Sequence, residues 1–147
     1  MFKHILVPTD GSQLSQDAVS KAVTLAKENG AKVTALYVKL PPPAHYWSHV
    51  IWVNLPEPSA FEEFSEKEAQ AALAMVESAC REQGVECSKF SVTNEHVYQA
   101  IIDEATKNSC DLIFMASHGR RGVDALVLGS ETHKVLTHSK IPVLVSR

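Results

Sequence analysis

Short apolar segments alternate along this chain with segments in which apolar residues recur at helical spacing, and this alternation restricts the fold more than any other feature. The predicted strands are 2–7, 32–38, 85–92, 112–116 and 141–146. The predicted helices begin near Leu14, Ala60, Asn94 and Ser130, and the first two stop at Gly30 and Gly84. Asn94 is expected to be an N-cap, with Glu95 in the first turn. The pattern predicts an α/β fold: an open five-stranded parallel sheet with helices on both faces.

The segment from Asp111 to Ser130, DLIFMASHGRRGVDALVLGS, contains the most informative motif. It reads as a buried strand, then a glycine-containing loop, then the start of an amphipathic helix. Glycine lets the backbone approach a ligand closely. A helix N-terminus presents free N–H groups and about half a positive charge. The segment therefore predicts an anion site.

The glycine spacing in this segment resembles a known pattern. Ala116, Gly119, Gly129 and Ser130 match Gly-x2-Gly-x9-Gly followed by Ser or Thr, which is the ATP-binding loop of the universal stress protein family, with alanine at the first glycine. The segments ILVPTDGS at 5–12 and IPVLV at 141–145 are also similar to that family, so the resemblance covers the whole chain. It implies one domain over 1–147, a Rossmann-like sheet of order 3-2-1-4-5, and bound ATP, with Mg²⁺ as an optional companion.

Ala116 is the one departure from the family pattern. If this position required a positive φ, alanine would cost about 1 kcal/mol. It directly follows an apolar strand, however, so we expect extended backbone and only an added methyl group near the ligand.

In this strand order, a crevice forms between the first and fourth strands, where open α/β sheets bind ligands. The candidate nucleotide-binding residues are Pro8, Thr9, Asp10, Val38, Met115, Ala116, Ser117, His118, Gly119, Arg120, Gly129, Ser130, Glu131 and Thr132. Gly119, Gly129 and Ser130 are expected at the phosphates. Val38 is assigned to the adenine ring, through its backbone, by the resemblance alone.

Several of these residues have an alternative structural interpretation. Asp10 would bind ribose or a cation, or would form a turn or N-cap before Gly11. His118 would contact phosphate or fold the loop, and Arg120 and Arg121 are either phosphate ligands or solvated loop residues. Glu131 beside a phosphate is electrostatically unfavourable unless its side chain points away. The loop 40–58, with Trp47 and Trp52, would be a lid or contact surface or a packed aromatic cluster.

Other ligand classes have weaker support. His45 and His49 are four residues apart but lie beside Pro41–Pro43, and no carboxylate or cysteine completes a metal site. The net charge of −3 comes without a basic stripe, which disfavours nucleic acid. No apolar run reaches the roughly 20 residues that span a bilayer, and the N-terminus lacks a signal-peptide layout, so we expect a cytoplasmic protein without membrane contact. Three cysteines without a Cys-x-x-Cys motif indicate buried or semi-buried thiols.

The resemblance implies an ATP-binding regulatory module of the stress response. There is no Walker loop, and nothing in the sequence gives His118 a fixed partner, so we expect little or no hydrolysis. The alternatives are a slow ATP hydrolase on the same fold and a nucleotide-free dimeric interaction protein. Ile141, Val143 and Val145 alternate with Pro142 and Leu144, so the last strand is apolar on both faces. We expect it to be an edge strand that pairs with a second copy in a homodimer, because an exposed apolar edge promotes aggregation.

Overall fold

The computed structural model describes residues 1–42, 58–119 and 128–147. The described strands are β1 (His4–Pro8), β2 (Lys32–Lys39), β3 (Cys87–Thr93), β4 (Leu112–Ala116) and β5 (Val143–Ser146). The described helices are α1 (Gln13–Asn29), α3 (Pro58–Gln83), α4 (Val97–Lys107) and α5 (Ser130–His138). All strand pairs are parallel and the order is β3-β2-β1-β4-β5, which confirms the predicted sheet.

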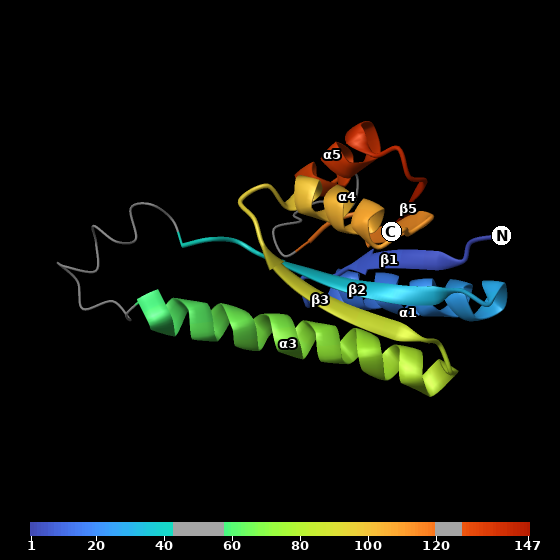
Figure 1. Ribbon diagram of the computed structural model, residues 1–147, viewed down its shortest axis with the longest axis horizontal. Helices are drawn as coiled ribbons and strands as arrows, with labels where there is room; N and C mark the ends of the chain where they lie inside the picture. The colour runs from blue at the N-terminus through green and yellow to red at the C-terminus, as the bar shows by residue number, and fades with distance from the viewer. Residues whose placement is uncertain (43–57, 120–127) are drawn as a thin grey trace.

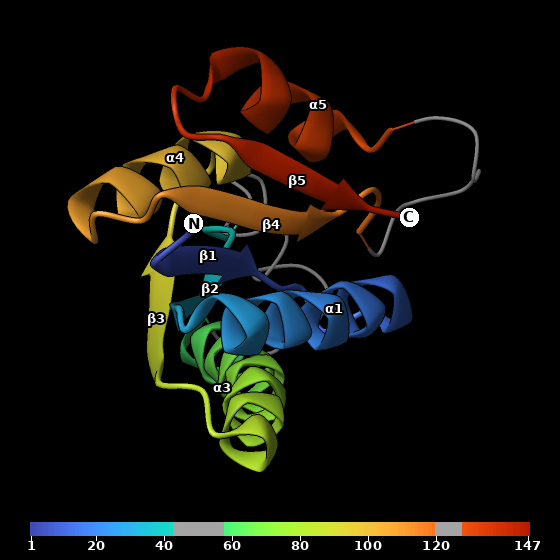
Figure 2. The same cartoon turned by 90° about the vertical axis from the view of Figure 1, so that its right-hand side faces the viewer.

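Helices α1 and α3 cover one face of the sheet and α4 and α5 cover the other (Figures 1 and 2), with a hydrophobic cluster on each face. On one face, Val7 and Val33 pack with Ala22 of α1 and Leu73 of α3. The alternate strand residues point to the other face, where the second cluster joins the sheet to α4 and α5; it includes Leu6, Leu36, Ile113, Ile101 and Val135. Strands covered on both faces read as continuous apolar runs, which explains the sequence pattern of β1 and β4.

Helix α1 has the termini that the sequence predicts. The hydroxyl of Ser12 accepts a hydrogen bond from the Ser15 N–H, at 3.2 Å, and so caps the first turn. At the other end, Gly30 has φ 63°, and the N–H groups of Gly30 and Ala31 donate to the carbonyls of Lys27 and Ala26. A left-handed residue at this place favours glycine because a side chain there would be strained.

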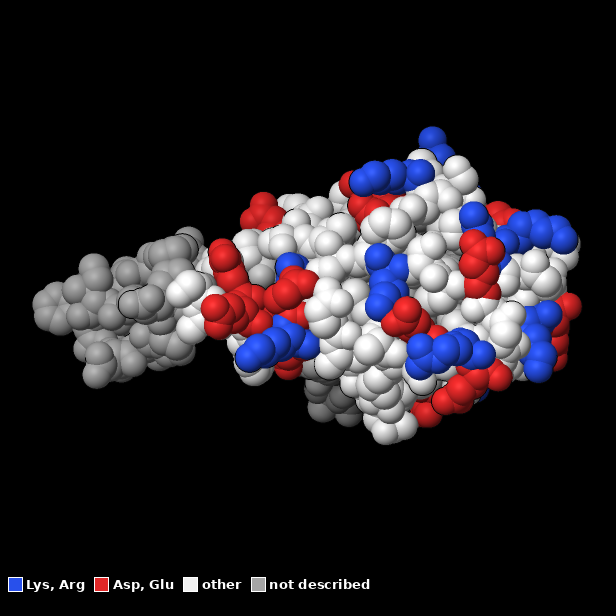
Figure 3. All heavy atoms as spheres, turned by 60° about the horizontal axis from the view of Figure 1, so that its bottom comes forward, with Lys and Arg blue, Asp and Glu red and all other residues white. Residues whose placement is uncertain are grey.

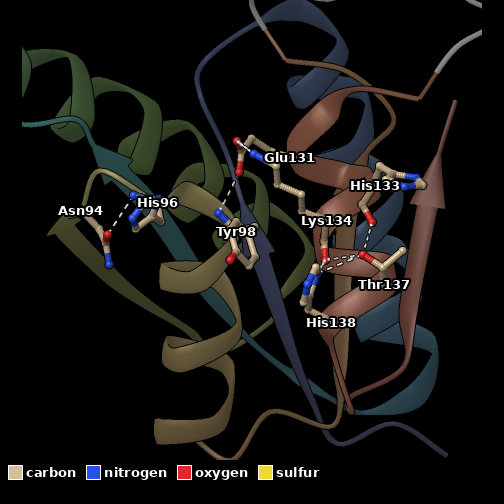
Figure 4. Close-up of polar contacts among 8 residues, drawn as sticks. All are labelled: Asn94, His96, Tyr98, Glu131, His133, Lys134, Thr137 and His138. Atoms are coloured by element: carbon tan, nitrogen blue, oxygen red, sulfur yellow. Dashed lines mark hydrogen bonds and ion pairs between the residues drawn. The ribbon is translucent and has the colours of Figure 1, made fainter.

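The predicted start of α4 is wrong. Its N-cap is His96, and neither Asn94 nor Glu95 lies in the helix. Asn94 instead accepts a hydrogen bond from the His96 N–H, which makes a turn just before the helix (Figure 4). The first turn is satisfied by a residue distant in sequence, because the carboxylate of Glu131 accepts the Tyr98 N–H at 2.8 Å.

No helix among the described residues is long and apolar enough to cross a bilayer.

Candidate functional site

The carboxyl ends of β1, β2 and β4 open into a cavity of about 870 Å³. The predicted site residues that line it are Pro8, Thr9, Asp10, Val38, Met115, Ala116, His118, Gly119, Gly129, Ser130, Glu131 and Thr132. Ser117 is buried behind this lining, and Arg120 lies outside the described residues, as do Arg121, His45, His49, Trp47 and Trp52. The structure thus brings the motifs after the first and fourth strands to one cavity.

The end of β1 is held by a network of short hydrogen bonds. The Thr9 N–H donates to the Leu36 carbonyl at 2.9 Å, which ties the segment to β2. The Thr9 hydroxyl oxygen accepts from the Ser15 hydroxyl at 2.8 Å and from the Gly11 N–H at 3.2 Å. The Asp10 carboxylate accepts the Ser12 N–H at 2.9 Å, so Asp10 forms the turn that the sequence allowed and lines the cavity as well.

Gly119 approaches Asp10 so closely that a side chain on Gly119 would displace the Asp10 carboxylate. A Cβ built on Gly119 would lie 2.5 Å from the Asp10 Oδ2, well inside van der Waals contact. The glycine of the loop after β4 therefore fits the carboxylate after β1. These two motifs, which are 109 positions apart, form one surface.

Gly129 makes the second close approach of the loop. Its N–H donates to the Ser117 carbonyl at 2.7 Å, and a Cβ at this position would lie 3.1 Å from the same oxygen. The Ser117 N–H is itself bonded to Ser146 in β5. This contact places the first residues of α5, Ser130 and Glu131, at the cavity. The N–H groups of a first helical turn have no partner within the helix and are suited to an anion.

Ala116 fits the site without strain. It is the last residue of β4 and is buried, and the only non-glycine residue with positive φ among those described is Ser109. Its carbonyl accepts a hydrogen bond from the Thr132 hydroxyl at 2.9 Å, which joins β4 to α5. The expected extended backbone is confirmed.

His118 and Glu131 differ in how their polar atoms are bonded. The Nδ1 of His118 lies 3.1 Å from the Ser117 hydroxyl, whereas its Nε2 is buried and has no hydrogen-bond partner among the described residues. The Glu131 carboxylate caps α4 through Tyr98, and its other oxygen lies 3.5 Å from the Lys134 ammonium (Figure 4). The negative charge of Glu131 is thus partly balanced by the Tyr98 N–H and the Lys134 ammonium.

One wall of the cavity was not predicted from the sequence. It comes from α3, through Phe61, Ser65 and Glu68, and Val97 and Ile101 of α4 line the same cavity. These α3 residues are spaced four and three positions apart, which places them on one helix face. That spacing is visible in the sequence, but the position of α3 beside the site is set by tertiary packing.

The described charges at the cavity are mostly negative. Asp10, Glu68, Glu95 and Glu131 line it, against Lys39, which is paired with Glu66. Figure 3 shows acidic side chains gathered over the N-terminal part of α3. Within 1–42, 58–119 and 128–147, no three His, Cys, Asp or Glu side chains are grouped as a metal site.

Comparison with known proteins identifies the family. The model of the universal stress protein family matches residues 1–147. Universal stress protein MJ0531 of Methanocaldococcus jannaschii is 34% identical over 99% of this chain and 82% of its own length. Universal stress protein YxiE of Bacillus subtilis is 33% identical over the full length of both chains. The chain therefore belongs to the universal stress protein family.

Solved structures share the fold. The hypothetical protein MJ0577 superposes with a TM-score of 0.78 at 24% identity, covering 99% of this chain and 95% of the other. A universal stress protein in complex with cAMP gives 0.74 at 20% identity, with 99% and 97% coverage. One from Archaeoglobus fulgidus in complex with dAMP gives 0.70 at 18% identity, with 99% and 98% coverage.

Proposed function

We propose that this chain binds ATP in the cavity and acts as a dimeric regulatory protein of the stress response in the cytoplasm. The observation that carries the proposal is the pair of close glycine contacts, Gly119 on Asp10 and Gly129 on Ser117. Both glycines bring backbone without a side chain to the cavity that the first turn of α5 also lines, and such an arrangement suits a phosphate. The relatives in complex with cAMP and dAMP support a nucleotide as the ligand class.

The described residues suit the parts of the nucleotide. The hydroxyl of Ser130 and the amides of the first turn of α5 would bind phosphate oxygens. The buried Nε2 of His118, which has no hydrogen-bond partner within the part of the chain that the structure describes, is a further candidate to bond a ligand. Asp10 would accept from the ribose hydroxyls, and the backbone of Val38 would meet the adenine ring, as the family resemblance implies.

Mg²⁺ would accompany the phosphates rather than occupy a protein site. This ion usually keeps several waters and binds one or two carboxylates together with phosphate oxygens. Among the described residues, the Asp10 carboxylate lies against Gly119 of the loop, so it is the candidate ligand.

Thermal unfolding with and without Mg-ATP tests the proposal. A ligand at about 100 times its dissociation constant stabilises the native state by roughly 2.7 kcal/mol, so the midpoint should rise by several degrees. Gly129→Val should remove this shift, because its Cβ would meet the Ser117 carbonyl. Ser130→Ala should reduce it, whereas Thr137→Ala, which removes a hydroxyl at the far end of α5, should not. An unchanged midpoint at millimolar ATP contradicts the proposal.

We expect little or no turnover of the bound ATP. Hydrolysis needs an oriented water and stabilisation of the charge that develops as the bond breaks, and groups that only hold phosphate do not provide it. Slow hydrolysis is the alternative function, with His118 as its base. A phosphate-release assay separates the two: turnover near the ~10 per second of a typical enzyme, lost in His118→Ala, would favour the hydrolase.

The homodimer is proposed to form through β5. This strand lies at one edge of the sheet, and Leu144 is 37% exposed on it, while Pro142 precedes its first residue. If β5 paired with β5 of a second copy, the contact would cover the free edge of the sheet and the exposed Leu144. Sedimentation should show a dimer at tens of micromolar. A dimer without any nucleotide effect would favour the nucleotide-free alternative.

A further inference from the structure

The N-terminal part of α3 forms a cavity wall that the proposed phosphate contacts do not use. Phe61, Ser65 and Glu68 line the cavity from one face of the helix. The next residues along the helix that turn to the sheet, Ala69 and Leu73, are buried in the core. The wall is therefore a direct extension of the core-facing side of α3, where its position is fixed by packing.

An ion pair joins this wall to the end of β2. The Lys39 ammonium lies 2.5 Å from the Glu66 carboxylate, and Gln70 bonds the other oxygen of Glu66. Hydrogen bonding to Lys39 lowers the pKa of Glu66. In Figure 1 the first turns of α3 lie beside the chain that leaves β2. Since Lys39 follows Val38, the contact places the turn that carries Ser65 and Glu68 next to the backbone assigned to the adenine ring.

The start of α5 sets the direction of the nucleotide. Carboxylates line the cavity near the glycine loop (Asp10 and Glu131) as well as elsewhere (Glu68 and Glu95), so the direction follows from the N–H groups of the first turn of α5 and the glycine backbone, which would attract phosphates. The phosphates therefore belong at Gly119, Gly129 and Ser130, and the opposite end of the ligand belongs at α3.

The side chains of the wall suit a nucleobase that carries an amino group. An ionised carboxylate only accepts hydrogen bonds, so Glu68 would bond an N–H and not a ring nitrogen with a lone pair. Phe61 offers an aromatic ring for contact with the base. We propose that Phe61 and Glu68 are the base-recognition residues of this site, with Glu68 accepting a hydrogen bond from the exocyclic amino group of adenine. This inference rests on the proposed ATP binding.

Ligand comparison by isothermal titration calorimetry tests the role of Glu68. Purine riboside triphosphate has the phosphates and sugar of ATP but lacks the amino group. The wild-type protein should bind ATP roughly tenfold more tightly than purine riboside triphosphate, as expected for a hydrogen bond to a charged group. Glu68→Ala should weaken ATP binding by that factor and leave the analogue unchanged. Glu63→Ala, an exposed carboxylate on the same helix, should preserve the preference.

A second pair of variants tests Phe61. Phe61→Ala should weaken ATP and the analogue by a similar factor, because the ring contact does not depend on the amino group. Phe64→Ala is the matched control, since Phe64 lies on the same helix and is 62% exposed. Lys39→Ala should also weaken binding, while Lys89→Ala, which breaks the other described ion pair between α3 and a strand, should not.

The outcomes separate this inference from the proposed function. Equal binding of both ligands to the wild type, or a preference that survives in Glu68→Ala, overturns base recognition by Glu68 and leaves ATP binding intact. Binding of neither ligand to the wild type overturns the proposed function and this inference with it. The wild-type comparison needs no variant to fold, and Glu68→Gln, which keeps an acceptor oxygen, should retain part of the preference.

Discussion

The two ends of the sheet treat their polar side chains differently. At the amino end, polar groups bond to one another: the Asp111 carboxylate accepts the N–H groups of Lys3 and His4 at 2.8 and 3.0 Å, and the His4 Nε2 lies 2.6 Å from the Thr34 hydroxyl. At the carboxyl end, polar groups are bonded as well, as Asp10 is to the Ser12 N–H, but Asp10, Ser130 and Glu68 also line a cavity. Because folds of this class bind ligands where the strands end, we propose that the amino end serves stability and the carboxyl end serves recognition.

The largest expected effect comes from breaking the amino end. Asp111→Ala removes two hydrogen bonds to a carboxylate that joins β1 to β4, and should lower the free energy of unfolding by about 2 kcal/mol. The affinity of the folded protein for ATP should not change, because the cavity lies at the other end. Urea unfolding and calorimetry measure the two quantities. Asp103→Ala is the control, since this exposed carboxylate bonds only Gln99 among the contacts described, and it should cost less than about 0.5 kcal/mol.

A reduced ATP affinity in Asp111→Ala would show that the two ends are coupled, and the division between stability and recognition would be wrong.

Glu131 contributes to both stability and the cavity, because it lines the cavity and also accepts the Tyr98 N–H at the start of α4. Glu131→Gln should cost about 0.5–1 kcal/mol of unfolding free energy, since the neutral amide caps Tyr98 less well and loses the pair with Lys134. ATP should bind as well or better, because a negative charge near the phosphates is removed. Urea unfolding and calorimetry again measure both. If the loss of ATP binding free energy exceeded the loss of unfolding free energy, this would indicate that Glu131 contacts the ligand directly.

The sequence predicted the local parts of this molecule well. The bounds of β4 and the first residue of α5 agree with the prediction, because a buried apolar run and a glycine-serine pair are local signals. The strand order came from the family resemblance and is confirmed.

Contacts between distant segments were harder to predict. The first turn of α4 bonds Glu131, which is 33 residues from Tyr98, and a local pattern around Asn94 does not reveal such a distant partner. The α3 wall depends on how α3 packs against the sheet through residues such as Leu73, and a helical pattern alone does not show which end of the sheet the neighbouring residues reach.

A smaller effect should appear in the pH dependence of stability. Burial lowers the pKa of His4, and Lys32 lowers it further, against the opposing influence of Asp111, Asn108 and Glu86. The unfolded chain therefore binds a proton more readily than the native state, so unfolding free energy should fall as the pH drops below about 6.5. The slope should be a fraction of the roughly 1.4 kcal/mol per pH unit that one proton gives. Urea unfolding from pH 8 to 5.5 measures it, and His4→Gln should flatten the slope; an unchanged slope in that variant would assign it to another group.

The smallest effect concerns thiol reactivity, which also tests how well the amino end of the sheet is protected from solvent. Cys110 lies there, and burial raises its pKa to about 11, whereas a hydrogen bond with Cys80 lowers the pKa of the half-buried Cys87. The same hydrogen bond and burial raise the pKa of Cys80, which is fully buried. Because the thiolate is the reactive form, iodoacetamide at pH 8 should label Cys87 first and leave Cys80 and Cys110 protected until the protein unfolds. Peptide mass spectrometry over time measures the order. Early labelling of Cys110 in the native protein would show that the amino end opens more readily than its hydrogen bonds imply, and would weaken the contrast between the two ends of the sheet.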